Sequence, residues 1–269
     1  MIRVGLAALA VLAAAPAAAK TPVDLLLALA VDVSRSVDEE EARLQRQGYI
    51  QAFRDPEVVA AIRTGMLGRI AVRYFEWGGE GNIAEITGWT LVEDATGAAA
   101  FADSLARLPP RPMLWTSISG AIDYALPWLK ENEFDATRKV LDISGDGPNN
   151  SGDLVVPARD RAIAAGVTIN GLPIMDQGSG MYTAYNIRNL DLYYRDCVIG
   201  GPGAFLIVAE DFNDFARAVR RKLILEIANR APQPPAWPMR IVLAQAGPDI
   251  RESPPCNVGE QMLRYRDDF

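Results

Sequence analysis

The feature that most restricts the fold is a nearly continuous apolar run at residues 23–31, VDLLLALAV, which ends directly in polar residues. A strand with one solvent-facing side alternates apolar and polar side chains, whereas a strand covered on both faces reads as an unbroken apolar run. The run is too short to cross a bilayer as a helix. It therefore predicts a central strand of a largely parallel sheet.

Strands and helices alternate along the rest of the chain. The sequence predicts strands at residues 69–76, 83–90, 139–143, 167–174 and 204–209, and helices at 39–53, 97–107, 116–130, 153–165 and 212–229. This alternation is typical of an α/β fold with a mostly parallel sheet and helices on both faces. The short Gly-rich turn at residues 78–82 predicts a hairpin, which makes the 83–90 strand an antiparallel edge strand.

The amino-terminal residues 1–19 have the pattern of an export signal. Arg3 precedes a short apolar run, and three small residues at 17–19 form a cleavage pattern. We expect cleavage after Ala19, a periplasmic or secreted protein, and no stable membrane insertion afterwards. The mature chain then has a folded domain at residues 20–230 and a Pro-rich tail at 231–269 that packs back on the domain.

The composition excludes several classes of function. The chain has no histidine, which removes Ser-His-Asp and Cys-His catalysis and the HExxH zinc site. A net charge of -7 makes it a poor nucleic-acid binder, because nothing compensates the approach to the phosphates. In an oxidising compartment the two cysteines, Cys197 and Cys256, most simply pair, and the bond would tie the tail to the irregular region at 176–203.

Polar residues follow the predicted strands at the edge where α/β sheets bind their ligands, beyond the carboxyl ends of the strands. Five of them provide oxygen donors: Asp32, Ser34 and Ser36 after the first strand, Thr116 at the start of the 116–130 helix, and Asp146 after the 139–143 strand. Carboxylates and hydroxyls are the donors that a hard divalent cation prefers. Each motif alone is also explained by helix capping or an ordinary turn. Their order along the chain predicts a metal site.

With this three-loop pattern the chain resembles a von Willebrand factor A-type (VWA) domain that carries a metal-ion-dependent adhesion site (MIDAS), and more narrowly an uncharacterised family of exported bacterial proteins. The resemblance covers residues 22–229. It implies a doubly wound, six-stranded sheet. It also implies a Mg²⁺ ion, replaceable by Mn²⁺ or Ca²⁺, which is held by Ser34, Ser36 and Thr116, with Asp32 and Asp146 bound directly or through water. In such domains a Glu or Asp carboxylate of a partner protein fills the open position of the ion.

The chain departs from the usual pattern of this family in two loops. Leu-Trp-Thr stands at residues 114–116 in place of Gly-Gly-Thr, and Gly-Asp-Gly stands at 145–147 in place of Thr-Asp-Gly. Tryptophans 77, 89 and 115 are expected to pack in the interior, with an exposed rim beside Thr116 as the alternative for Trp115. Residues of the three loops are candidate contacts to a partner: Arg35, Trp115, Pro148, Asn149 and Asn150.

Three alternatives stay open. The acidic residues at 38–41 either bind a second cation or complement the dipole of the helix that they open. Asp32 could be the nucleophile of a metal-dependent phosphohydrolase, but that chemistry usually needs a carboxylate where Ser34 stands and a lysine nearby, and Lys139 lies at the wrong end of its strand. The ion could also be purely structural in a scaffold protein. We expect a binding module and not an enzyme.

Overall fold

The structure of the protein is a computed structural model that describes residues 19–34, 36–175, 187–229, 241–243 and 251–267. Of the predicted export signal only Ala19 falls within these ranges, so the signal lies outside the described residues. None of the helices in the described ranges is long and apolar enough to cross a membrane.

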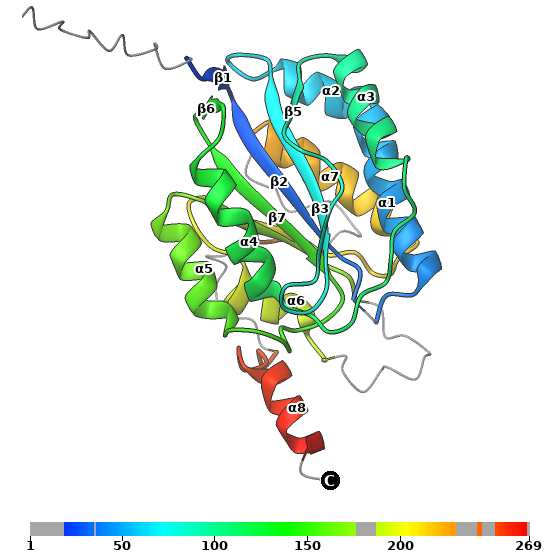
Figure 1. The fold of residues 1–269 in the computed structure, drawn as a ribbon, viewed down its shortest axis with the longest axis vertical. Helices are drawn as coiled ribbons and strands as arrows, with labels where there is room; N and C mark the ends of the chain where they lie inside the picture. Colours follow the sequence, from blue (N-terminus) through cyan, green and yellow to red (C-terminus); the bar gives the residue numbers. More distant parts are fainter. Residues whose placement is uncertain (1–18, 35, 176–186, 230–240, 244–250, 268–269) are drawn as a thin grey trace, which may run out of the picture.

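Eight strands form the main sheet within the described residues (Figure 1). Their order is β10 (Ile241–Leu243), β9 (Phe205–Ile207), β8 (Thr168–Pro173), β7 (Lys139–Gly145), β2 (Leu25–Asp32), β3 (Ile70–Trp77) and β4 (Ile83–Glu85), and β5 (Thr90–Val92) also pairs with β3. The strands from β9 to β3 are parallel, whereas β10, β4 and β5 are antiparallel to their neighbours. A separate parallel pair joins β1 (Thr21–Val23) to β6 (Phe134–Ala136).

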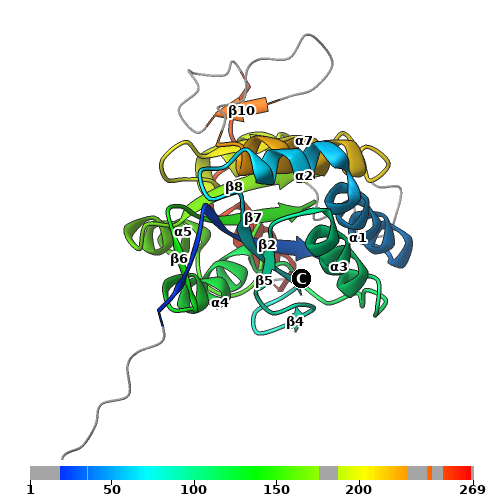
Figure 2. The ribbon, with the colours of Figure 1, turned by 90° about the horizontal axis from the view of Figure 1, so that it is seen from above.

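Helices cover both faces of the sheet (Figure 2). One face packs against α1 (Glu39–Arg54), α2 (Pro56–Arg63), α3 (Ala95–Leu105) and α7 (Phe215–Ile227). The other face packs against α4 (Ile118–Lys130), α5 (Val155–Ala164) and α6 (Leu190–Tyr193), which continues into a π-helical turn at Tyr194–Val198. The last helix, α8 (Val258–Asp267), lies below the body of the domain in Figure 1.

Strand β2 explains why the sequence contains a continuous apolar run. All of its residues are buried. The odd-numbered residues from Leu25 to Val31 belong to the core beneath α1 and α7, whereas the even-numbered residues from Leu26 to Ala30 belong to the core beneath α4. Because side chains alternate between the two faces of a strand, both sets must be apolar. The predicted fold class, a doubly wound and mostly parallel α/β sheet, is confirmed.

The sheet has eight strands within the described residues, not the six that the resemblance implies. The predicted strand at 83–90 is divided into β4 and β5. The backbone N–H groups of Ile86 and Thr87 both donate to the carbonyl oxygen of Tyr74, which interrupts the regular ladder between the two segments. The other additional strand, β10, comes from the Pro-rich tail, whose composition does not favour a strand.

Helix α2 is absent from the predicted helices. Asp55 caps it by accepting a hydrogen bond from the N–H of Glu57 at 2.8 Å, and Pro56 occupies its first position. An Asp followed by Pro is a start signal for a helix, because the proline ring already has the helical φ angle. The signal for this second helix was therefore present in the sequence.

A disulfide joins Cys197 in the π-helical turn to Cys256 in the tail, as expected. The two Cα atoms are 5.4 Å apart, and the bond spans a sequence separation of 59 residues. In the chain-entropy description, closing a loop of this length stabilises the folded state by about 4 kcal/mol.

Candidate metal centre

Three loops meet at the carboxyl edge of the central strands, in the lower part of Figure 1. The first loop follows β2 and begins at Asp32, the second precedes α4, and the third begins at Gly145 where β7 ends. Because β2 and β7 are parallel neighbours, the loops that follow them leave the sheet at the same edge.

The five predicted ligands contact one another through a chain of hydrogen bonds. Thr116 Oγ1 donates to Ser34 Oγ at 3.1 Å, and the hydroxyl oxygens of Ser34 and Ser36 lie 3.2 Å apart. Ser36 donates to Asp146 Oδ1 at 2.7 Å. The backbone N–H of Ser34 donates to Asp32 Oδ1 at 2.7 Å. The structure thus brings together all five residues from three separate loops.

These oxygens are largely shielded from water. Asp32, Ser34, Thr116 and Asp146 are buried, and Ser36 is partly exposed. The second carboxylate oxygen of Asp32, Oδ2, is inaccessible to solvent and has no hydrogen-bond partner among the described residues. Burial, and then the neighbouring Asp146 carboxylate, raise the pKa of Asp32 well above its usual range. A buried carboxylate oxygen without a partner is unfavourable unless something else satisfies it.

The set of donors fits a hard divalent cation. Mg²⁺ prefers oxygen ligands in an octahedral shell and keeps several of its waters. Within the described ranges no group of three or more His, Cys, Asp or Glu side chains is placed to hold a metal ion. The candidate site therefore depends on three hydroxyls in addition to its two carboxylates, and Asp32 Oδ2 is an acceptor that such an ion would satisfy.

The second loop leaves the hydroxyl of Thr116 free of helix capping. The N-cap of α4 is Ser117, whose Oγ accepts from the N–H of Gly120 at 3.1 Å. Thr116 is held through its backbone, because its N–H donates to Asn150 Oδ1 and its carbonyl oxygen accepts from the N–H of Asn150, both at 2.8 Å. The capping explanation of Thr116 is therefore wrong.

Trp115 has a φ angle of 63°, in the left-handed region. A residue with a Cβ atom is destabilised there by about 1–2 kcal/mol, and glycine is not. The loop therefore places tryptophan in a backbone conformation that suits glycine, the residue usual here in the pattern that the sequence resembles. Trp77 is buried as expected, but Trp115 is 41% exposed, so the expectation that Trp115 packs in the interior is wrong. Arg35, another candidate contact, lies outside the described residues.

Gly145 allows the third loop to approach the first closely. A Cβ atom at this position would lie 2.8 Å from both Asp32 Oδ2 and the hydroxyl oxygen of Tyr194, so a side chain here would displace one of them. Tyr194 is buried, and its hydroxyl has no hydrogen-bond partner among the described residues. Burial, and then the carboxylates of Asp32 and Asp146, raise the pKa of Tyr194. No sequence motif pointed to this tyrosine.

Three of the predicted partner contacts are buried: Pro148, Asn149 and Asn150. Asn149 Oδ1 accepts from the N–H of Ser119 at 2.9 Å, while Asn150 holds the second loop as described above. Burial counts against a contact role for all three residues. The side chains of Asn149 and Asn150 instead satisfy backbone groups of the neighbouring loop.

The acidic residues after the first loop mainly cap α1. Asp38 Oδ1 accepts from the N–H of Glu41 at 2.8 Å, and Glu41 Oε2 accepts from the N–H of Asp38 at 2.7 Å. Glu40 forms an ion pair with Arg43 on the helix surface. These contacts support the helix-capping explanation of this acidic stretch.

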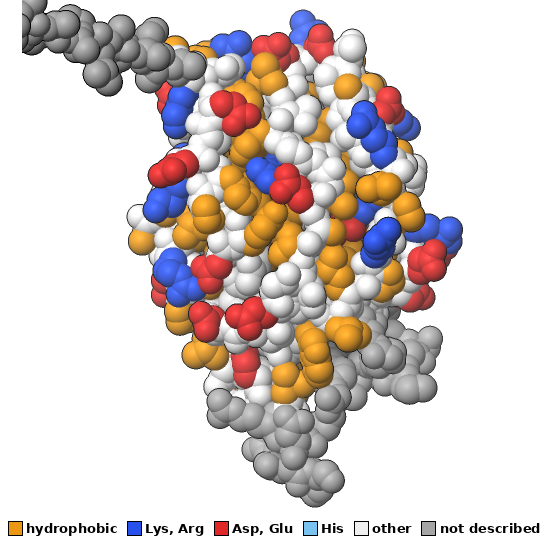
Figure 3. All heavy atoms as spheres, in the orientation of Figure 1, with side chains coloured by type: hydrophobic (Ala, Val, Ile, Leu, Met, Phe, Trp, Pro, Cys, Tyr) orange, Lys and Arg blue, Asp and Glu red, His pale blue; other side chains and the backbone are white. Residues whose placement is uncertain are grey.

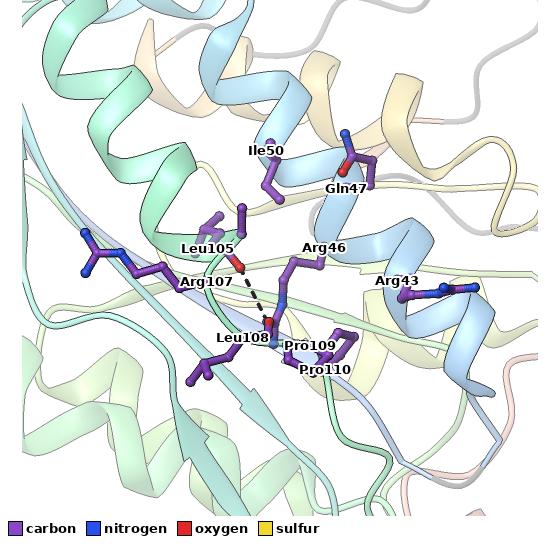
Figure 4. A pocket seen from close by; sticks show the side chains of 10 residues that line it. Arg43, Arg46, Gln47, Ile50, Leu105, Arg107, Leu108, Pro109 and Pro110 are labelled. Atoms are coloured by element: carbon purple, nitrogen blue, oxygen red, sulfur yellow. Dashed lines mark hydrogen bonds between the residues drawn. The ribbon is translucent and has the colours of Figure 1, made fainter.

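A shallow pocket of ≈ 370 Å³ lies between α1 and the segment that follows α3, and none of the five candidate ligands lines it (Figure 4). Arg46 lies among its lining residues, and its guanidinium group is bound to the carboxylate of Glu76 and to the carbonyl oxygens of Leu105 and Leu108. Through these bonds Arg46 connects α1 to the sheet and to the segment after α3.

Several solved structures are similar to this fold. The pilus adhesin SpaC from Lactobacillus rhamnosus GG aligns with a TM-score of 0.56 and 12% identity, over 78% of this chain and 31% of that chain. Proximal thread matrix protein 1 from the mussel byssus, solved with a zinc-occupied MIDAS motif, aligns with a TM-score of 0.50 and 14% identity, over 76% of this chain and 46% of that chain. A von Willebrand factor type A structure from Catenulispora acidiphila aligns with a TM-score of 0.49 and 17% identity, over 76% of this chain and 43% of that chain.

This chain thus spans less than half the length of those proteins, and at such identities the similarity shows the fold alone, which is VWA-like. No curated protein matches the sequence. One family profile matches residues 22–231, which is most of the chain. We conclude that the chain belongs to the family described as a protein of unknown function, DUF1194.

Proposed function

We propose that the protein is an exported, divalent-metal-dependent binding module that engages an acidic side chain of a partner protein. One observation carries the proposal: five oxygen-bearing side chains from three loops converge, and one of them, Asp32, has a buried carboxylate oxygen, Oδ2, with no hydrogen-bond partner among the described residues. The VWA-like fold supports it, since proximal thread matrix protein 1 has a similar fold and a MIDAS motif occupied by zinc.

In this proposal Ser34, Ser36 and Thr116 bind Mg²⁺ directly, and Asp32 and Asp146 bind it directly or through water. Mn²⁺ or Ca²⁺ would suit the same donors. Because the hydroxyl ligands are neutral, the ion would supply a positive charge that attracts an anionic oxygen from outside. The hydrogen bonds among the hydroxyls hold these three donors close together.

Exposed apolar side chains near the site support a protein partner. Leu114 and Trp115 precede Thr116 in the second loop, and Leu154 lies at the start of α5, which follows the third loop; all three are about half-exposed. Figure 3 shows hydrophobic side chains at the lower end of the molecule, where these loops lie. A metal–carboxylate bond buries little surface, so contacts of this kind would supply much of the affinity.

A phosphohydrolase remains the less favoured alternative. Ser34 stands where that chemistry usually needs a second carboxylate, and its hydroxyl is bonded to Ser36 and Thr116. Lys139 pairs in register with Leu26, at the opposite end of β2 from Asp32. These positions favour binding over turnover.

Export to the periplasm or the exterior is part of the same proposal. The apolar amino-terminal pattern favours it. The disulfide between Cys197 and Cys256 is consistent with it, because such bonds persist in oxidising compartments.

The proposal is tested by capturing partners with the mature chain, once in Mg²⁺ and once in a chelator. Thr116→Ala deletes one hydroxyl ligand without changing the charge, and it should abolish capture of a partner that depends on Mg²⁺. Thr90→Ala makes the same chemical change on the edge strand β5 and should leave capture intact.

Mutation of the acidic residues of the captured partner should identify one carboxylate whose loss has the same effect as the chelator. If the partner binds Thr116→Ala as tightly as wild type, or binds equally well in the chelator, the metal-bridged function is wrong and a scaffold with a structural ion is the better description.

A further inference from the structure

Part of the carboxyl-terminal tail, residues 251–263, is bound to the domain at the end where the metal loops lie. The disulfide ties Cys256 to Cys197 in the π-helical turn. Arg251 forms an ion pair at 2.8 Å with Asp191 of α6. Figure 1 shows α8, which begins within this segment, at the same end of the molecule as the carboxyl edge of the sheet.

Asn149 of the third metal loop is the point where this tail segment touches the site. Its Nδ2 donates to Glu260 Oε1 at 2.7 Å and to the carbonyl oxygen of Asp153 at 3.0 Å. Its Oδ1 accepts from the N–H of Ser119 in α4 at 2.9 Å. The whole amide group of Asn149 is thus engaged, and the tail supplies one of its three partners.

The backbone of the tail also packs directly on this loop. A Cβ atom at Gly259 would overlap the carbonyl oxygen of Asn149, so only glycine allows the observed approach. The hydroxyl of Tyr193 accepts from the N–H of Asn149 at 3.1 Å and lies 3.5 Å from the carbonyl oxygen of Cys256, to which it donates. The tail therefore fixes Asn149 through both its side chain and its backbone.

Fixing Asn149 also restrains two of the candidate ligands, Asp146 and Thr116. Asp146 lies three residues before it in the same loop, and Asn150 follows it and holds the backbone of Thr116 at 2.8 Å. The bond from Ser119 to Asn149 ties the start of α4 to the same point. The relative position of Asp146 and Thr116 thus depends on a loop that the tail holds in place.

We propose that the tail segment 251–263 supports the metal site. Glu260 positions Asn149 and thereby holds Asp146 and Thr116 at the spacing that binds the ion. The inference rests on the proposed metal binding and adds to it a requirement for the docked, disulfide-bonded tail. Glu260 is a positioning residue, since it acts on the ligands through Asn149.

The test is the affinity of the full mature chain for Mn²⁺, measured from the electron paramagnetic resonance signal of the free ion. Glu260→Ala removes the acceptor and should weaken Mn²⁺ binding by about tenfold, the lower end of the effect of residues that support metal ligands. Glu260→Gln keeps an oxygen acceptor for Asn149 and should restore affinity to within about twofold of wild type. Glu252→Ala removes an equal charge from an exposed side chain of the same segment and should have no effect.

A second variant removes the disulfide. Cys197→Ser/Cys256→Ser should weaken Mn²⁺ binding at least as much as Glu260→Ala, because the whole segment is then released. A tail that only stabilised the fold would lower the melting temperature of these variants and leave the Mn²⁺ dissociation constant unchanged, and that result overturns the inference while the proposed function stands. Failure of the wild-type chain to bind Mn²⁺ overturns both.

Discussion

Three buried charged groups, two on α7 and one on β7, predict how the stability of the domain depends on pH. The Lys222 ammonium pairs with Glu226 at 2.5 Å and with Asp142 of β7, and all three side chains are excluded from solvent. Within this group of three, full ionisation gives one positive and two negative charges. Burial, and then the neighbouring Glu226, raise the pKa of Asp142 to about 7.

This shift favours the folded state at low pH. A carboxyl group whose pKa is raised on folding binds its proton more tightly in the folded state. Its contribution to the free energy of unfolding is therefore complete below the ordinary pKa of 3.8 and is lost as the pH rises through about 7. About three pKa units at ~1.4 kcal/mol each correspond to ~4 kcal/mol. Asp142→Asn has nearly the same shape and carries no charge. It should lose this pH dependence and exceed wild type in free energy of unfolding by up to ~4 kcal/mol near pH 8.

The assay is urea unfolding of the mature protein at several values from about pH 5 to about pH 8, with a chelator present so that bound metal does not contribute. Asp135→Asn, on an exposed position of β6, changes the net charge equally and should follow wild type. The reasoning is refuted if Asp142→Asn loses stability with rising pH as steeply as wild type, or if it is the less stable protein near pH 8.

Two further predictions concern the metal loops. At a hundredfold excess over its dissociation constant, Mg²⁺ should stabilise the folded state by ~2.7 kcal/mol, which is a melting shift of roughly 5–10 °C, and Asp146→Ala should abolish the shift in a thermal melt. Trp115→Gly should unfold at a higher urea concentration than Trp115→Ala, because glycine adopts a positive φ angle without strain. Within regular helices and strands a glycine variant is less stable than the alanine variant by roughly 0.5–1 kcal/mol. If the alanine variant is also the more stable protein here, Trp115 is not strained.

The centre of the fold was predictable because its pattern is local. Burial on both faces leaves an unbroken apolar run at β2, and the one-sided stripe of α4 repeats at helical spacing. The edges of the sheet depend on contacts between distant segments. The break between β4 and β5 requires two N–H groups to share the carbonyl oxygen of Tyr74, and β10 requires the tail to return to β9. Neither requirement leaves a periodic pattern in the sequence.

The candidate ligands were predictable for another reason, because the topology of a parallel sheet places the residues after its strands at one edge. That rule locates Asp32 and Asp146 but does not determine where other side chains of the loops point. Asn149 was expected to face a partner and lies inside, because it bonds to Ser119 and Glu260, which are 30 and 111 residues away. Tyr194 lies beside Gly145, as Asp32 does, because the π-helical turn packs against this edge of the sheet.

Strand β2 also affects how the chain folds. Its parallel neighbours are far along the chain, since Leu25 pairs with Ile70 and Leu26 pairs with Lys139. Contacts between such distant residues form late, because the loops between them must first close. Until then the run from Leu25 to Val31 is an uncharged apolar segment with both edges unpaired, which is the kind of segment that pairs with its copies in other molecules. Aggregation during refolding should therefore start at the strand that lies deepest in the finished protein, and dilution should reduce it.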